Sequence, residues 1–266
     1  MENFCHTPKY PVQTLSKALE VITYLKNNSS ADGTTIISIS KALNMGKSGV
    51  HRILDTLMAY NYVEKAGPTS SSYRLSWGLF DAGNAVPKQH TLNNINYSAI
   101  LEKLCARFNE TVNLGVISGR ETTIICKIEP EIKLRTNTQL GEREPLHATA
   151  VGKLFLCDFS DEQLKAYFEN ISIQNSTEST IVSFSSMKNE LSIIRKNDFA
   201  LDNEEYVDGM ICFAMPIRDF NGKIVSGISI SGPSKRMTNE KLKDIEHVLK
   251  QACNEISYFL GYSSIL

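Results

Sequence analysis

The sequence predicts an α+β protein with an N-terminal winged helix-turn-helix, a linker helix and a C-terminal domain in which helices cover an antiparallel sheet. Residues 10–75 contain three helical patterns followed by a hairpin pattern, which is the element order of a winged helix-turn-helix. Residues 94–266 alternate strand and helix patterns, as α+β domains do. Residues 76–93 lie between these parts and favour a linker helix that ends near Pro87.

Three helical patterns open the N-terminal part. Apolar residues recur with the 3.6-residue helical period over residues 14–27, 36–43 and 47–60. One face of the first pattern carries Leu15, Ala18, Leu19, Ile22 and Leu25. One face of the third carries Val50, Ile53, Leu54, Leu57 and Met58. Because apolar faces pack inward, we expect these faces to form the core of the domain.

The remaining elements are indicated by strand patterns and by capping and turn signals. The runs 62–65 and 72–75 flank a Gly/Pro/Ser turn and predict the wing. Further strands are indicated at 111–118, 122–128, 210–218 and 223–231, the last two joined by the hairpin signal Asn221-Gly222. Helices are indicated at 98–108, after Pro145, after the capping box Ser160-Asp161-Glu162-Gln163, at 186–197 and at 239–260.

The outer face of the third helix points to nucleic acid. Opposite the apolar stripe it presents Lys47, Ser48, His51, Arg52 and Asp55. Such side chains contact bases and phosphates when the second helix of a helix-turn-helix enters the major groove of double-stranded DNA. Arg74 in the wing favours the same role, as do 8 Lys and Arg against 5 Asp and Glu over residues 1–75. An ordinary solvated helix face is the alternative.

A family resemblance covers nearly the whole chain. The stretch Leu43–Leu54, with the sequence LNMGKSGVHRIL, resembles the recognition-helix signature of the isocitrate lyase regulator (IclR) family, although Gly49 stands where the family often has Thr. Further blocks resemble the wing and the effector domain of that family in the same order: Ser72–Leu75, Thr111–Leu114, Pro145–Lys153, Asp202–Glu205, Gly209–Cys212 and Ser229–Pro233.

The resemblance implies a GAF/profilin-like effector domain and dimers that pair into tetramers. It also implies which positions contact a small-molecule effector. These are Thr136, Glu144, Ala150, Val151, Asp202, Met210, Cys212, Ser229 and Ser231.

Physical arguments point to a small polar acid as the effector. A helix that starts after Pro145 would present free N–H groups near residues 148–151, and such a helix end attracts anions. Ser229 and Ser231 lie two apart on a strand and therefore share a face. An ionised Asp202 repels an anion and would accept hydrogen bonds from hydroxyl groups instead. The combination favours a hydroxylated or keto acid over an aliphatic or aromatic monoacid.

Each of these residues also has a structural alternative. Met210 and Cys212 are residue types that commonly fill a core, Ser231 could be an ordinary strand residue, and Asp202 could be a loop carboxylate. Taken together, these residues therefore indicate an effector site more strongly than any one of them does alone.

Other classes of protein and site are not favoured. The run Gly227–Ser231 lacks the second glycine of a nucleophile elbow, Gly46-Lys47-Ser48 lacks the first glycine of a phosphate loop, and His147 has no paired nucleophile. The 6 cysteines show no C-x-x-C spacing. No apolar run approaches the ~18 residues of a membrane span, and the N-terminus has no secretory pattern. We expect no catalytic residue, metal or cofactor, and a cytoplasmic protein.

These observations predict a DNA-binding transcriptional regulator, a repressor of a catabolic operon controlled by a small organic or sugar-derived acid. A homodimer or homotetramer is expected because one such helix-turn-helix covers a single half-site. Two alternatives remain: an enzyme of small-acid metabolism with a regulatory DNA-binding head, and a winged helix that binds another protein instead of DNA.

Overall fold

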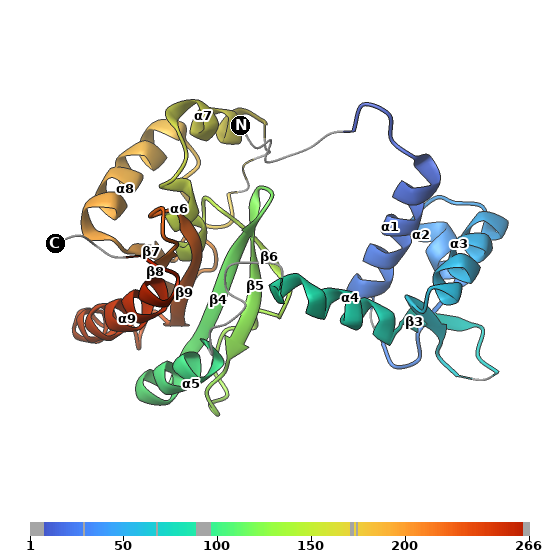
Figure 1. Ribbon diagram of the computed structural model, residues 1–266, viewed down its shortest axis with the longest axis horizontal. Coiled ribbons are helices and arrows are strands. Elements are labelled where there is room, and N and C mark those ends of the chain that lie inside the picture. Colours follow the sequence, from blue (N-terminus) through green and yellow to red (C-terminus); the bar gives the residue numbers. More distant parts are fainter. Residues whose placement is uncertain are drawn as a thin grey trace. The chain divides into compact units, whose positions relative to one another are not determined.

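The structure of the chain is a computed structural model that describes residues 8–28, 30–67, 69–88, 97–170, 173 and 175–262. Contacts divide the chain into two units (Figure 1). One unit holds the described residues up to Lys88, and the other holds those from Tyr97 onward. Residues 89–93 of the expected linker lie outside the described residues.

The N-terminal unit is a winged helix-turn-helix, as predicted. Its elements are α1 (Gln13–Asn27), β1 (Thr34–Thr35), α2 (Ile36–Ala42), α3 (Lys47–Ala59), β2 (Val63–Lys65), β3 (Ser72–Leu75) and α4 (Trp77–Lys88). The three strands form an antiparallel sheet in the order β1-β3-β2, of which only β1 was not predicted. Helix α4 continues one residue past Pro87.

The core of this unit confirms the stripe of α3 and corrects that of α1. Val50 and Leu54 of α3 are fully buried. In α1, Val21 and Leu25 are buried, whereas Leu15 and Leu19 are 59% and 55% exposed. Of the predicted apolar face, Ala18, Ile22 and Leu25 therefore contact the core, and Leu15 and Leu19 do not, because the core to which α3 and β3 contribute does not reach them.

The C-terminal unit is an antiparallel sheet covered by helices, as predicted. Its elements are α5 (Tyr97–Phe108), β4 (Thr111–Ser118), β5 (Glu121–Ile128), β6 (Arg143–Pro145), α6 (Ala150–Leu156), α7 (Asp161–Asn170), α8 (Phe184–Asn197), β7 (Ala200–Asn203), β8 (Met210–Arg218), β9 (Ile224–Pro233) and α9 (Asn239–Phe259). Within the described residues the strand order is β6-β5-β4-β9-β8-β7, and every neighbouring pair is antiparallel.

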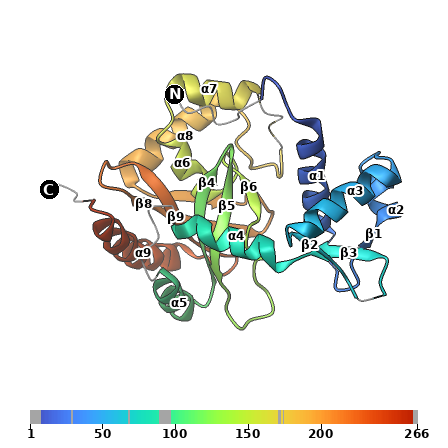
Figure 2. The same ribbon diagram turned by 45° about the vertical axis from the view of Figure 1, so that its right-hand side comes forward.

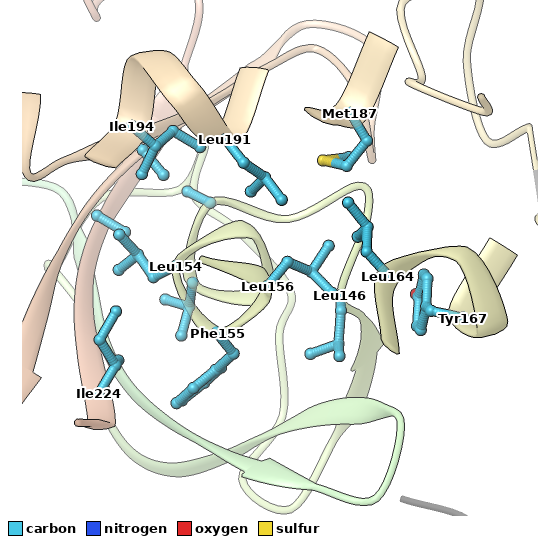
Figure 3. Close-up of a cluster of buried hydrophobic side chains, with 14 residues drawn as sticks. Leu146, Leu154, Phe155, Leu156, Leu164, Tyr167, Met187, Leu191, Ile194 and Ile224 are labelled. Carbon is cyan, nitrogen blue, oxygen red and sulfur yellow. The ribbon is translucent and has the colours of Figure 1, made fainter. Parts of the chain in front are cut away.

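Helices cover both faces of this sheet. Helices α5 and α9 pack on one face and against each other, while α6 packs on the other face beneath α8 (Figures 1 and 2). Side chains from α7, α8 and β9 surround α6, among them Leu164, Leu191 and Ile224 (Figure 3). Helix α6 therefore forms the centre of this layer of the core.

Two paired glycines let α6 lie close to the sheet. Gly115 of β4 is directly opposite Gly227 of β9. A Cβ atom on Gly227 would lie 3.1 Å from both Leu154 Cδ1 and Val151 Cγ1, which is closer than ordinary contact. The glycines thus bring the first turn of α6 against β4 and β9, where the candidate site lies.

The start of α7 confirms the capping box, and the start of α6 corrects an expectation. Ser160 Oγ accepts a hydrogen bond from the Gln163 amide, and Gln163 Oε1 accepts one from the Ser160 amide. The helix expected directly after Pro145 begins only at Ala150, because the backbone of its N-cap Thr149 is extended.

The short strands β6 and β7 were not predicted. Among the helices of the described residues, none is both long and apolar enough to cross a membrane.

Candidate functional site

The exposed face of α3 holds five of the predicted DNA-contacting residues. Helix α3 begins at Lys47 after the break at Gly46, and its buried stripe fixes its rotation about the helix axis. On the opposite side the structure exposes the side chains of Lys47, Ser48, His51, Arg52 and Asp55. These residues therefore form one continuous surface that an incoming major groove could reach.

The sixth residue, Arg74, lies in the wing and has a partner within the chain. Its Nε donates to Glu64 Oε1 at 2.7 Å across the β2–β3 pair. The hydrogen bond from Arg74 lowers the pKa of Glu64 below its ordinary value. Arg74 is exposed, and a guanidinium has five N–H donors, so donors remain for a phosphate.

A cavity of about 510 Å³ lies in the C-terminal unit, over the start of α6. All nine residues that the resemblance assigned to effector contact line this cavity. Nine further residues line it that were not predicted: Asn113, Arg135, Asn137, Thr138, Glu142, Thr149, Tyr206, Val207 and Asp208. Its volume is in the range of small-molecule sites.

The sheet supplies one wall of the cavity through strand register. Asp202 of β7 is opposite Cys212 of β8, and Cys212 is opposite Ser231 of β9. Two residues before Ser231, Ser229 is opposite Asn113 of β4. Residues that are directly opposite or two apart share a face, so these five side chains face the same side. Burial raises the pKa of the Cys212 thiol well above its ordinary value, which keeps the thiol neutral.

Asp202 is a buried carboxyl group that fixes the following loop. Its Oδ1 accepts hydrogen bonds from the amides of Glu205 at 2.8 Å and Tyr206 at 3.2 Å. Burial raises the pKa of Asp202 to about 6, although these hydrogen bonds act in the opposite direction. The carboxyl group therefore positions Tyr206 at the cavity as well as lining it.

The start of α6 offers fewer amides than expected. Thr149 Oγ1 caps the helix by accepting from the Gly152 amide at 3.2 Å. Within the described part of the chain, the amides of Ala150 and Val151 have no hydrogen-bond partner, and both residues line the cavity. The amides of residues 148 and 149 precede the helix, so the expected row of free N–H groups shortens to these two.

Among the described residues, two buried polar atoms at the cavity have no hydrogen-bond partner. They are Asn113 Oδ1 and Thr136 Oγ1. Asn113 is only 4% exposed, and an unsatisfied polar atom at that depth costs about 1–3 kcal/mol. A polar occupant of the cavity would satisfy both atoms.

Comparison with known proteins identifies the relatives of this chain. The family model of the bacterial transcriptional regulator IclR C-terminal domain matches residues 89–258, and that of the IclR helix-turn-helix domain matches residues 14–67. The chain belongs to the IclR family. It is 31% identical to the HTH-type transcriptional regulator KdgR of Escherichia coli K12 over 253 residues, which is 94% of each chain.

Two further relatives support the same assignment. The HTH-type transcriptional repressor AllR of Escherichia coli K12 is 28% identical over 249 residues, covering 94% of this chain and 90% of AllR. The crystal structure of Thermotoga maritima IclR matches with a TM-score of 0.76 at 31% identity, covering 95% of this chain and 100% of that one.

Membership of the IclR family makes this chain a DNA-binding transcriptional regulator with a C-terminal effector domain. Its relatives are named as regulators and repressors, so the enzyme alternative is not favoured. The geometry of His147 agrees, because its Nδ1 lies 3.1 Å from the hydroxyl of Tyr167 in a buried position and the residue does not line the cavity.

One residue that lines the cavity of this IclR-family member, Asn113, could have been predicted from the sequence but was not. Asn113 is a polar residue between Val112 and Leu114 in a buried strand, where it needs a partner. Arg135 and Tyr206, by contrast, stand in irregular segments whose course the sequence pattern does not predict.

Proposed function

We propose that this IclR-family regulator represses a catabolic operon in the cytoplasm and responds to a hydroxylated or keto acid bound in the cavity. The observation that carries the proposal is the cavity itself, which Asp202, Ser229 and Ser231 line on the same sheet face as Asn113, whose side-chain Oδ1 has no hydrogen-bond partner among the described residues. Hydroxyl groups of a ligand would donate to the carboxyl oxygens. Its carboxylate would accept from the serines and from the amides of Ala150 and Val151.

A homodimer or homotetramer is part of this proposal. Leu15 and Leu19 of α1 are more than half exposed, as are Trp77 and Phe80 of α4 at 74% and 61%. Apolar side chains of this size are commonly covered by a partner subunit. Sedimentation of the full chain at micromolar concentration tests this assembly, and a monomer with and without DNA would contradict it.

Arg52→Ala is expected to weaken operator binding, because Arg52 lies on the outermost side of α3. If the guanidinium reads a guanine, the loss is about 1–3 kcal/mol and specific for the base. If it contacts a phosphate, the loss is uniform across sequences and the salt dependence becomes shallower. Fluorescence anisotropy with DNA from upstream of the gene, at several salt concentrations, separates these results.

The control for this experiment is Lys17→Ala, which removes the same charge from the exposed surface of α1. Unchanged affinity of a folded Arg52→Ala protein would remove Arg52 from the DNA interface. Binding that does not weaken as salt increases would contradict phosphate contact altogether.

Asp202→Ala is expected to weaken a hydroxylated acid by about 1–3 kcal/mol and to affect a simple keto acid little. Calorimetry with D-gluconate, glyoxylate and 4-hydroxybenzoate measures the difference. Asp202→Asn is the matched variant, because its Oδ1 still accepts from the amides of Glu205 and Tyr206 while the charge is gone. If 4-hydroxybenzoate binds best and neither variant changes affinity, the effector class is wrong.

A further inference from the structure

We infer that the cavity binds a polyhydroxylated acid together with one proton, which the carboxyl group of Glu144 holds. This inference rests on the proposed function and adds a second, coupled ligand to it. It predicts that the regulator responds to an acid effector more strongly at lower pH.

Glu144 lies at the cavity, where its carboxyl group can hold a proton next to a bound ligand. Glu144 lies on the edge strand β6 opposite Thr122, and it lines the cavity. Its side chain is half-buried, and no described residue donates a hydrogen bond to its carboxyl oxygens. Asn113, buried and also without a partner for its Oδ1, lines the same cavity, so the acidic side chain faces a space built for a polar occupant.

The charged groups that line the cavity around Glu144 are mainly acidic. Four carboxyl groups line the cavity, those of Glu142, Glu144, Asp202 and Asp208, together with Tyr206 and Cys212 as further titratable groups. Among the described residues on the lining, the one cationic side chain is that of Arg135, whose Nε already lies 3.2 Å from Glu129 Oε1. A carboxylate that enters this space meets several like charges and too little positive charge to offset them.

Protonation of one carboxyl group reduces this conflict. It takes away one negative charge, and it converts an acceptor into an O–H donor that the carboxylate of the ligand can accept from. The proton comes from the solvent, so above the pKa of Glu144 binding of the anion raises the number of protons bound by the protein by up to one.

Glu144 is the better holder of this proton than Asp202. Two backbone amides donate to Asp202 and stabilise its ionised form, whereas nothing in the described residues does so for Glu144. Burial, with Glu142 and Asp202 nearby, raises the pKa of Glu144 to about 7, above the value of about 6 for Asp202. A bound anion would raise the pKa of Glu144 further.

Isothermal titration calorimetry with D-gluconate and its neutral analogue D-glucitol tests the inference. Titrations in phosphate and in Tris, which differ in ionisation enthalpy, report the protons taken up. For D-gluconate we expect an uptake approaching one proton at about pH 8 and affinity that falls about tenfold from about pH 6 to about pH 8. D-glucitol should show neither effect.

Two variants complete the experiment. Glu144→Gln should abolish proton uptake with D-gluconate and make its affinity independent of pH. Glu169→Gln removes the same charge from the exposed surface of α7, outside the cavity lining, and should retain both effects.

Three outcomes overturn the inference. They are pH-independent binding of D-gluconate by the unaltered protein, persistence of the pH dependence in Glu144→Gln, and no binding of D-gluconate up to about 10 mM. In the first two outcomes D-gluconate still binds, so they overturn this inference and leave the proposed effector class intact. Absence of D-gluconate binding counts against that effector class as well, whereas DNA binding, measured separately, tests the regulator function.

Discussion

Lys153→Met is expected to lower the free energy of unfolding of the C-terminal unit by about 3–5 kcal/mol. Lys153 is fully buried in α6, and its Nζ donates to Glu205 Oε1 at 2.6 Å and to Glu190 Oε1 at 3.1 Å. The variant leaves Glu205, itself 6% exposed and already without a partner for Oε2, as a buried charge with no cation. The cost is that of an uncompensated buried ion.

The same variant should acquire a characteristic pH dependence. Burial already raises the pKa of Glu205 above its ordinary value, and loss of Lys153 raises it further. Because the folded state then binds the proton more tightly than the unfolded state, the stability of the variant falls as pH rises from the ordinary pKa of a glutamate towards the raised pKa of Glu205 in the folded variant. Calorimetric unfolding of the full chain at about pH 5 and about pH 8 measures this difference.

Two further variants distinguish the effect of losing the buried ion pair from the effect of removing a lysine charge in general. Lys188→Met breaks the pair with Asp161, whose side chains are 50% and 61% exposed, and should cost less than about 1 kcal/mol. Lys153→Met combined with Glu205→Gln should recover much of the lost stability and abolish the pH dependence. A Lys153→Met protein within about 1 kcal/mol of the unaltered chain would contradict the argument.

The elements of the fold were predictable where periodicity is sustained. The stripe Val50–Leu57 located α3, and Asn221-Gly222 located the β8–β9 hairpin. Strands β6 and β7 escaped prediction because three or four residues cannot establish a period of two and, unlike the equally short β2 and β3, they do not flank a Gly/Pro/Ser turn that marks a hairpin. Leu15 and Leu19 were assigned to a core face because a helical period shows which residues share a face and not whether anything covers it.

In the candidate site, too, some features follow from local sequence and others depend on tertiary structure. The shared face of Ser229 and Ser231 follows from strand geometry alone. That Asp202 lies opposite Cys212 depends on the pairing of β7 with β8, which local sequence does not determine. The raised pKa of Glu144 depends on burial and on the approach of Asp202 from the opposite edge of the sheet, and both are tertiary effects. The raised pKa of Glu144 therefore could not have been predicted from the sequence.

Gly152→Ala is expected to destabilise the C-terminal unit by about 3 kcal/mol, although alanine is the better helix former. A Cβ atom at Gly152 would lie 2.5 Å from Leu146 Cα and Leu146 O, and 2.7 Å from Thr149 Oγ1. Two of these atoms belong to the backbone and cannot rotate away. The chain would have to move at Leu146, or α6 would have to move off the sheet together with Ala150 and Val151.

A methyl group added to a helical glycine stabilises through helix propensity and destabilises through steric clash. Comparison with Gly49→Ala separates these two effects. Gly49 also lies within a helix, but a Cβ atom there would meet nothing within 4 Å. Only helix propensity acts at that position, so Gly49→Ala should stabilise the N-terminal unit by about 0.5–1 kcal/mol. Opposite signs for the two variants in calorimetric unfolding are the expected result. A Gly152→Ala protein as stable as the unaltered chain would show that α6 is not held against the Leu146 backbone, and the close packing that places Ala150 and Val151 at the cavity would be wrong.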